Sequence, residues 1–86
     1  MSVLNCDAYD YLEIACLYGY ELEIQLKNGH SLNAKATNVG VVVVNGEKQE
    51  CLLVVQSDQA QRWLPTKELL SLRVLTQKAK FEFVRF

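Results

Sequence analysis

Three carboxylates near the start of the chain, Asp7, Asp10 and Glu13, follow one another at intervals of three residues. On a helix, residues three or four apart lie on one face, so these acids would form a single negatively charged strip. Two such carboxylates can act as an acid–base pair, and a row of them can bind a basic partner. Paired acids are also common on solvent-exposed helices, so their spacing alone does not indicate catalysis.

Charge is unevenly distributed along the 86 residues, although the net charge is only −1. Residues 1–23 contain five acids and no Lys or Arg, whereas residues 24–86 contain nine bases and five acids. Such asymmetry indicates charged partners. Acids in a first helical turn also stabilise the helix dipole by about 0.3–1 kcal/mol each, but Glu13, Glu21 and Glu23 fall outside that turn. The sequence therefore leaves two interpretations of the acids open, namely helix stabilisation and a binding surface.

Four tyrosines lie among these acids and also admit two interpretations. Buried tyrosine rings commonly keep their hydroxyl groups in water at the boundary of a core. An exposed tyrosine beside a carboxylate is instead typical of a protein–protein interface. We expect two of the four to be core or boundary residues; the four are Tyr9, Tyr11, Tyr18 and Tyr20.

Motifs that carry catalysis are absent from the sequence: there is no P-loop, no GxGxxG and no GxSxG. The single histidine, His30, falls in an expected turn. The three cysteines, Cys6, Cys16 and Cys51, form no CxxC pair and are expected to be reduced and mostly buried. We therefore expect a binding protein and not an enzyme, with no catalytic residues, no cofactor and no metal site.

The sequence contains no run of about 18 apolar residues, so no membrane span is expected. Its first ten residues lack the basic and apolar regions of a signal peptide, which predicts a cytoplasmic location. The length predicts a single domain over residues 1–86.

The acids lie within a helix that we predict near residues 7–18. Asn5, Cys6 or Asp7 can cap its start, since Asn and Asp are strong N-cap residues. Gly19 suits the left-handed position that commonly follows a helix.

This helix is expected to have two distinct faces. At about 100° per residue, the three acids span an arc of about 120°. Ile14 and Leu17 fall in the same arc, so we expect them to accompany the acids. The opposite face is apolar and is expected to pack on the core; it carries Ala8, Leu12, Ala15 and Cys16.

After the helix, the pattern changes to the alternation of apolar and polar residues that predicts half-buried strands, beginning with residues 20–27. Asn28–His30 and Asn45–Gly46 are typical of hairpin turns. Gly40 indicates a bulge or bend, and Pro65 is expected to end a strand before a single helical turn. Further strands are expected within residues 32–37, 41–44, 50–56, 61–64, 69–75 and 80–86.

A helix followed by five or six short antiparallel strands predicts an α+β fold. Strongly bent strands of this length avoid open edges by curling into a barrel. We therefore expect the N-terminal helix to pack on a small Sm-like or SH3-like barrel.

The basic C-terminal half supports an alternative, a module that binds single-stranded RNA. Cations near aromatic rings are typical of such modules. Strand alternation, however, would distribute these side chains over both faces of the sheet. They are Arg62, Trp63, Lys67, Arg73, Lys78, Lys80 and Arg85.

The N-terminal stretch resembles the Rho-binding antiterminator family of bacteria, the Rof (YaeO) proteins. The resembling motif is N-C-D-x-Y-D-x-L-E-hydrophobic-A-C, at residues 5–16. A strand ending at Leu26–Gly29 and the stretch L-x-A-K-A at Leu32–Ala36 continue the similarity. The similarity is clear over residues 4–38 and weak beyond residue 56.

The resemblance implies an Sm-like barrel with an N-terminal helix, and it implies a function. Members of that family bind the transcription termination factor Rho at or near its primary RNA-binding site and inhibit Rho-dependent termination. Rho is thus the expected partner, without direct binding of nucleic acid by this chain. The resemblance carries over to Asp7, Tyr9, Asp10 and Glu13, and the exposed arc adds Ile14 and Leu17 as contact residues.

Two features differ from the family's usual pattern. Ala8 stands where a second acid often follows the first, and the hairpin around Val41–Lys48 is longer than usual. We expect a monomer, and the sequence leaves open its stoichiometry on Rho.

Overall fold

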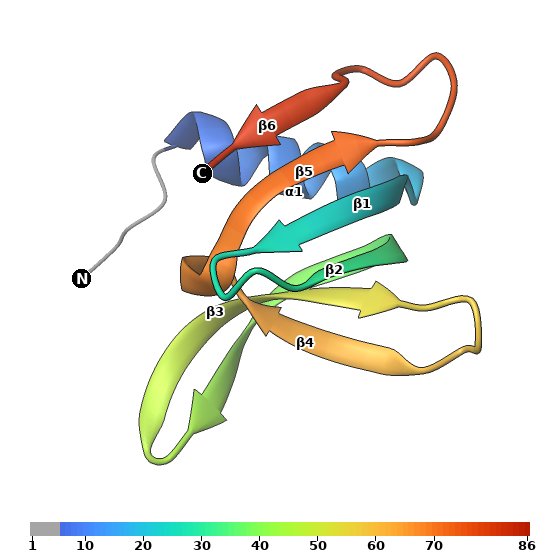
Figure 1. Cartoon of the computed structure of the whole chain (residues 1–86). Coiled ribbons are helices and arrows are strands. Elements are labelled where there is room, and N and C mark those ends of the chain that lie inside the picture. The colour runs from blue at the N-terminus through green and yellow to red at the C-terminus, as the bar shows by residue number, and fades with distance from the viewer. Residues whose placement is uncertain (1–5) are drawn as a thin grey trace.

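The computed structural model describes residues 6–86 and, from residue 9 onward, their side chains; it consists of one α-helix and a six-stranded antiparallel sheet (Figure 1). The elements agree with the predicted order of a helix followed by strands. They are α1 (Cys6–Tyr18), β1 (Glu21–Leu26), β2 (Ser31–Val44), β3 (Glu47–Val55), β4 (Gln61–Pro65), the short 3₁₀ helix η1 (Thr66–Glu68), β5 (Leu69–Val74) and β6 (Phe83–Arg85).

Helix α1 ends where the sequence predicts. Gly19 has a φ of +62°, the left-handed conformation that glycine adopts without steric cost. Its N–H donates to the carbonyl of Cys16 at 3.2 Å, and the N–H of Tyr20 donates to that of Ala15 at 2.9 Å. This pair of bonds is a Schellman motif, which satisfies the last carbonyls of the helix and turns the chain into β1.

The strands are ordered β4-β3-β2-β1-β5-β6, and the sheet is open. No described pairing joins β4 to β6, so the sheet does not close on itself, and the expected Sm-like or SH3-like barrel is not confirmed. The two outer strands have features that protect their open edges, although the sheet is not closed into a barrel. Strand β6 is only three residues long, and β4 carries Arg62 and ends at Pro65, all of which discourage pairing with a further strand.

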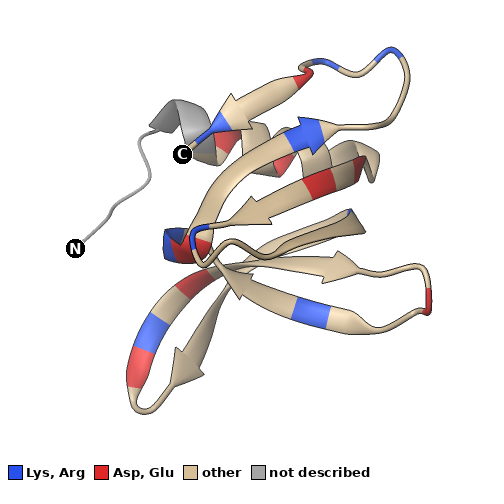
Figure 2. Cartoon of the chain, in the orientation of Figure 1, with Lys and Arg blue, Asp and Glu red and all other residues tan. Residues whose placement is uncertain are grey.

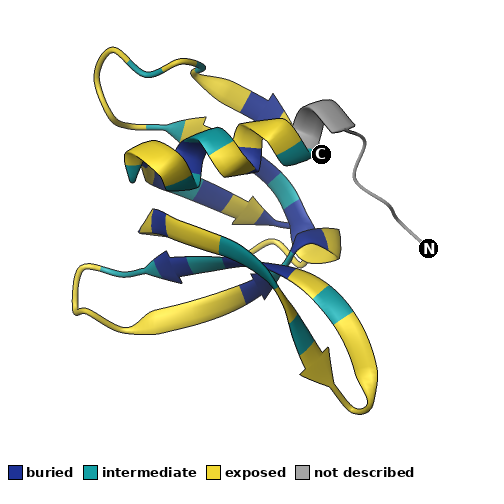
Figure 3. Cartoon of the chain, turned by 180° about the vertical axis from the view of Figure 1, so that it is seen from behind, coloured by how far each residue is buried: buried dark blue, intermediate teal, exposed yellow. Residues whose placement is uncertain are grey.

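The core lies between α1 and the inner face of the sheet (Figure 3). Leu12 and Ala15 are fully buried on the helix, as its apolar face predicts. On β1, Leu22 and Ile24 are buried while their neighbours are more exposed, as the alternating pattern predicts. The rest of the core comes from the other strands and is mostly aliphatic: Tyr20, Leu26, Ala34, Ala36, Leu52, Val54, Leu64, Leu69 and Leu72.

The expected break at Gly40 is wrong, because β2 pairs with β3 without interruption from Asn38 to Val44. The shift in register lies earlier, between Ala36 and Asn38, so Thr37 is the extra residue. Gly40 lies beside Trp63, and a Cβ there would lie 3.4 Å from the Trp63 ring, at the edge of ordinary van der Waals contact. The next hairpin turn is confirmed: Asn45 and Gly46 have φ values of 51° and 78°, which fit a type I′ turn.

Beyond β5, the expected last strand is shorter than predicted, because only Phe83–Arg85 pair with β5. The preceding loop is fixed to the core instead. The backbone N–H of Lys80 donates a 2.8 Å hydrogen bond to the hydroxyl of buried Tyr20, and the Phe81 ring packs 5.8 Å from the Tyr20 ring. No helix among residues 6–86 has the length and apolar character needed to cross a membrane.

Candidate partner-binding surface

The outward face of α1 carries two of the three predicted acids. Asp10 and Glu13 are exposed, and Leu17 beside them has 76% of its surface accessible to solvent. Ile14, expected on the same face, is only half-exposed because it packs against the core cluster. The side chain of Asp7 lies outside the described residues, although its backbone belongs to α1.

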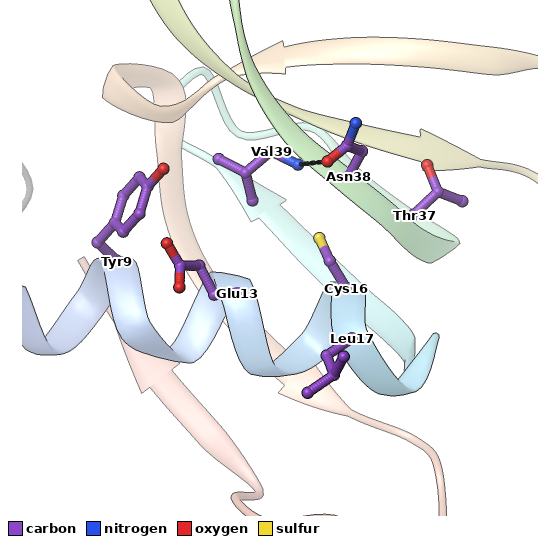
Figure 4. A pocket seen from close by; sticks show the side chains of 7 residues that line it. All are labelled: Tyr9, Glu13, Cys16, Leu17, Thr37, Asn38 and Val39. Carbon is purple, nitrogen blue, oxygen red and sulfur yellow. Dashed lines mark hydrogen bonds between the residues drawn. The ribbon is translucent and has the colours of Figure 1, made fainter.

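A groove separates this face of α1 from β2 (Figure 4). Tyr9, Glu13 and Cys16 point from the helix toward the strand. The groove has a volume of about 340 Å³ and is open to solvent. The described residues that line it are Tyr9, Glu13, Cys16, Leu17, Thr37, Asn38 and Val39.

The chemistry of the groove is that of a small docking surface. It combines one carboxylate, one tyrosine and the apolar side chains of Leu17 and Val39. Burial and, to a lesser degree, the charge of Glu13 raise the pKa of the Cys16 thiol to about 11. That thiol is therefore protonated near pH 7, which excludes it as a nucleophile at that pH.

The five N-terminal acids do not form one surface. Glu23 lies on β1, on the sheet face away from the core, where its Oε1 is 3.7 Å from Nε of Arg73 on β5. Among the described residues, Asp10 and Glu13 form no salt bridge. In Figure 2 the acids of the helix and those of β1 lie on different elements. Two of the described N-terminal acids without a salt bridge therefore lie on α1, and a third, Glu21, lies on β1.

The tyrosines divide between core and surface as expected. Tyr20 is buried, and Tyr18 stacks on it with ring centroids 5.7 Å apart. Tyr11 packs 5.0 Å from Phe81 at the boundary of the core. Tyr9 alone of the four lines the groove beside Glu13.

The basic residues are spread over several strands and loops (Figure 2). Arg62 and Trp63 lie on β4, at one edge, whereas Arg73, Phe83 and Arg85 lie on β5 and β6, at the other. The Arg73 guanidinium lies 5.4 Å from the centroid of the Phe83 ring, but it also faces Glu23. This separation weakens the RNA-binding alternative.

Sequence reasoning missed the β2 wall of the groove, formed by Thr37, Asn38 and Val39. The alternating pattern indicates a strand there but not which part of it faces the helix. Among the described residues, no group of three or more His, Cys, Asp or Glu side chains is arranged to hold a metal ion.

Comparison with known proteins decides the family. Residues 3–86 match the ROF family, described as modulators of Rho-dependent transcription termination. The chain belongs to the ROF family. The resemblance seen in the sequence is therefore confirmed, and modulation of Rho-dependent termination is the function of this family.

ROF proteins of known sequence and structure agree with this assignment. The chain is 43% identical over 58 residues to the protein rof of Escherichia coli (strain K12), an alignment covering 58% of this chain and 69% of that protein. The same values hold for the protein rof of Shigella flexneri. A structure described as YaeO bound to magnesium, from Vibrio cholerae O395, matches with a TM-score of 0.77 and 28% identity over 91% of this chain and 96% of that one. This likeness supports the α+β architecture described above.

Proposed function

We propose that this protein inhibits Rho by binding at or near its primary RNA-binding site through the outward face of α1. The observation that carries the proposal is the pair of exposed, unpaired carboxylates of Asp10 and Glu13 beside an open groove. Family membership supplies Rho-dependent termination as the process.

The chemistry of the partner supports this choice of surface. A protein site for single-stranded RNA combines cations that follow the phosphates with aromatic rings on which bases stack. Carboxylates on α1 would occupy the positions of phosphates. Tyr9 and Leu17 add apolar area next to the charges, as the centre of a protein–protein interface requires.

Occupation of that site by α1 would exclude RNA by charge and by volume, and so allow transcription to continue through Rho-dependent terminators. Arg73, Phe83 and Arg85 do form an exposed basic and aromatic cluster on β5 and β6. The carboxylate of Glu23 faces Arg73, however, which makes the cluster less suited to RNA phosphates. We therefore infer that the protein acts on Rho and not on the transcript.

A competition experiment tests the proposal. Labelled C-rich RNA is bound to Rho, and release of the RNA is followed by fluorescence anisotropy as this protein is added. We expect dose-dependent release, and no binding of the RNA by this protein alone. A ternary complex with unchanged RNA affinity would contradict competition, and an RNA shift without Rho would favour the alternative module.

A further inference from the structure

The tip of the β2–β3 hairpin is a two-stranded ribbon that extends away from the rest of the sheet (Figure 1). Strand β2 pairs with β1 only through Ser31–Lys35, and β3 pairs with β4 only through Cys51–Val55. From Gly40 to Glu50, therefore, the two strands pair only with each other among the described residues. Each has one edge whose backbone groups face no other strand.

These two open edges have different chemistry. Strand β3 carries Glu47, Lys48 and Glu50, and such charges are the usual means by which proteins keep edge strands from pairing. Strand β2 carries the run Val41–Val44, with no charge and no proline. Valine favours the extended conformation, so the β2 edge has the properties of a strand ready to accept a partner.

The apolar side chains of this ribbon are exposed. Val41 and Val43 have 61% and 64% of their surfaces accessible, and Val44 is also exposed. Because pairing is uninterrupted from Asn38 to Val44, Val41 and Val43 lie on one face of the ribbon together with Val39. Isolated two-stranded ribbons are at best marginally stable in water, so further pairing would stabilise this one.

We propose that the β2 edge pairs with the β2 edge of a second copy of this chain, antiparallel and about a two-fold axis at Val42. The ribbons would then join in the order β3-β2-β2-β3. In this register Val41 of one copy lies opposite Val43 of the other on the same face, so the two most exposed valines cover each other. Gly40 lies opposite Val44, and the pairing ends before the groove residues Val39 and Asn38.

A second copy fits this edge because the edge is self-complementary. In a two-fold interface each residue meets its symmetry-related position, so a charge at or beside the axis would lie close to its own copy. Residues 40–44 contain none. The charges of the two β3 strands would lie three strand spacings apart, about 14 Å. That distance exceeds the Debye length of about 8 Å at physiological salt, so their repulsion would be screened.

The expected dimer is weak and depends on concentration. Pairing over five residues per chain buries well below the roughly 1,200 Å² at which stable interfaces begin. The monomer expected from the sequence would then be the dilute form of a monomer–dimer equilibrium. The proposal is independent of Rho binding, since the acids of α1 take no part in it.

Sedimentation velocity on the full chain, from micromolar to millimolar concentration, tests the proposal with two matched variants. Val42 and Gln49 are cross-strand partners, so Val42→Glu and Gln49→Glu add the same charge at the same height on opposite strands. Val42→Glu would place two carboxylates face to face across the axis and should weaken dimerisation roughly tenfold or more. Gln49→Glu, on the outer strand, should leave it unchanged. Circular dichroism establishes that both variants fold.

Three results would overturn the proposal. They are a native protein that stays monomeric at millimolar concentration, a dimer that both variants weaken equally, and a dimer that neither weakens. Concentration-dependent amide shifts in NMR spectra should also be concentrated at Gly40–Val44. Shifts concentrated on α1 would assign the contact to another surface.

Discussion

Glu23 and Arg73 face each other across β1 and β5, with Oε1 3.7 Å from Nε, on the sheet face that α1 does not cover. This pair compensates one of the five N-terminal acids and separates it from the helix. The Arg73 side chain is 61% accessible and that of Glu23 is 41% accessible, so solvent screens the pair and it adds little to stability. Among the described N-terminal acids, the pair leaves Asp10 and Glu13 on α1 and Glu21 on β1 without a salt bridge.

Reversal of the helix charges should abolish inhibition of Rho. Asp10→Lys combined with Glu13→Lys replaces attraction to a basic partner with repulsion, which can cost several kcal/mol of binding free energy. Both side chains are exposed, so the free energy of unfolding should fall by less than about 1 kcal/mol. Rho-dependent termination in vitro and thermal unfolding measure the two effects.

The matched control is Glu47→Lys combined with Glu50→Lys, which reverses two exposed acids on β3, away from the groove. It should leave inhibition intact. If the β3 variant fails while the helix variant inhibits, the contact surface lies on the hairpin and not on α1.

Salt should weaken the complex with Rho. Attraction between exposed charges is screened as the Debye length falls from about 10 Å at 0.1 M to about 3 Å at 1 M. We expect the dissociation constant to rise steadily over this range in equilibrium binding measurements. An affinity independent of salt would indicate an apolar interface instead.

The same truncation to alanine should have different effects at two leucines of α1. Leu12 is fully buried, so Leu12→Ala should lower the free energy of unfolding by about 2–5 kcal/mol. Leu17 is mostly exposed beside the groove, so Leu17→Ala should leave stability within about 0.5 kcal/mol and weaken Rho binding. Urea unfolding and a Rho titration distinguish the two. Normal Rho binding by Leu17→Ala would remove that residue from the interface.

The Cys16 thiol should react slowly near neutral pH. Burial first, and Glu13 second, raise its pKa from 9.0 to about 11, so the thiolate forms only at high pH. Alkylation at Cys16, followed by peptide mass spectrometry, should be much slower at pH 8 than for a small free thiol. Glu13→Gln should speed the reaction by lowering the pKa, and an unchanged rate would show that Glu13 does not act on this thiol.

The same shift has a consequence for stability. The unfolded thiol ionises near pH 9, whereas the folded one holds its proton to about pH 11. The contribution of the protonated Cys16 thiol to the free energy of unfolding is therefore fully present below pH 9 and is lost as the pH rises toward 11. Cys51, whose pKa burial also raises, acts in the same direction. Urea midpoints measured between pH 8 and pH 11 should decrease, and a constant midpoint would contradict the shift.

Local features of this protein are determined by the sequence alone. The end of α1 follows from Gly19, and the turn at Asn45–Gly46 follows from two residues that tolerate positive φ. The buried face of β1 follows from strict alternation. Each depends on a few neighbouring residues, so a short stretch of sequence contains the required information.

The tertiary structure decides how these elements meet. Whether the sheet closes depends on pairing between β4 and β6, which are remote in sequence. The extra residue at Thr37 determines which part of β2 faces α1, and with it the wall of the groove. Ile14 shares an arc with the acids, yet it packs on the core because partners from distant segments reach it. Long-range register and packing are properties of residue pairs, and the pattern of a single stretch does not contain them.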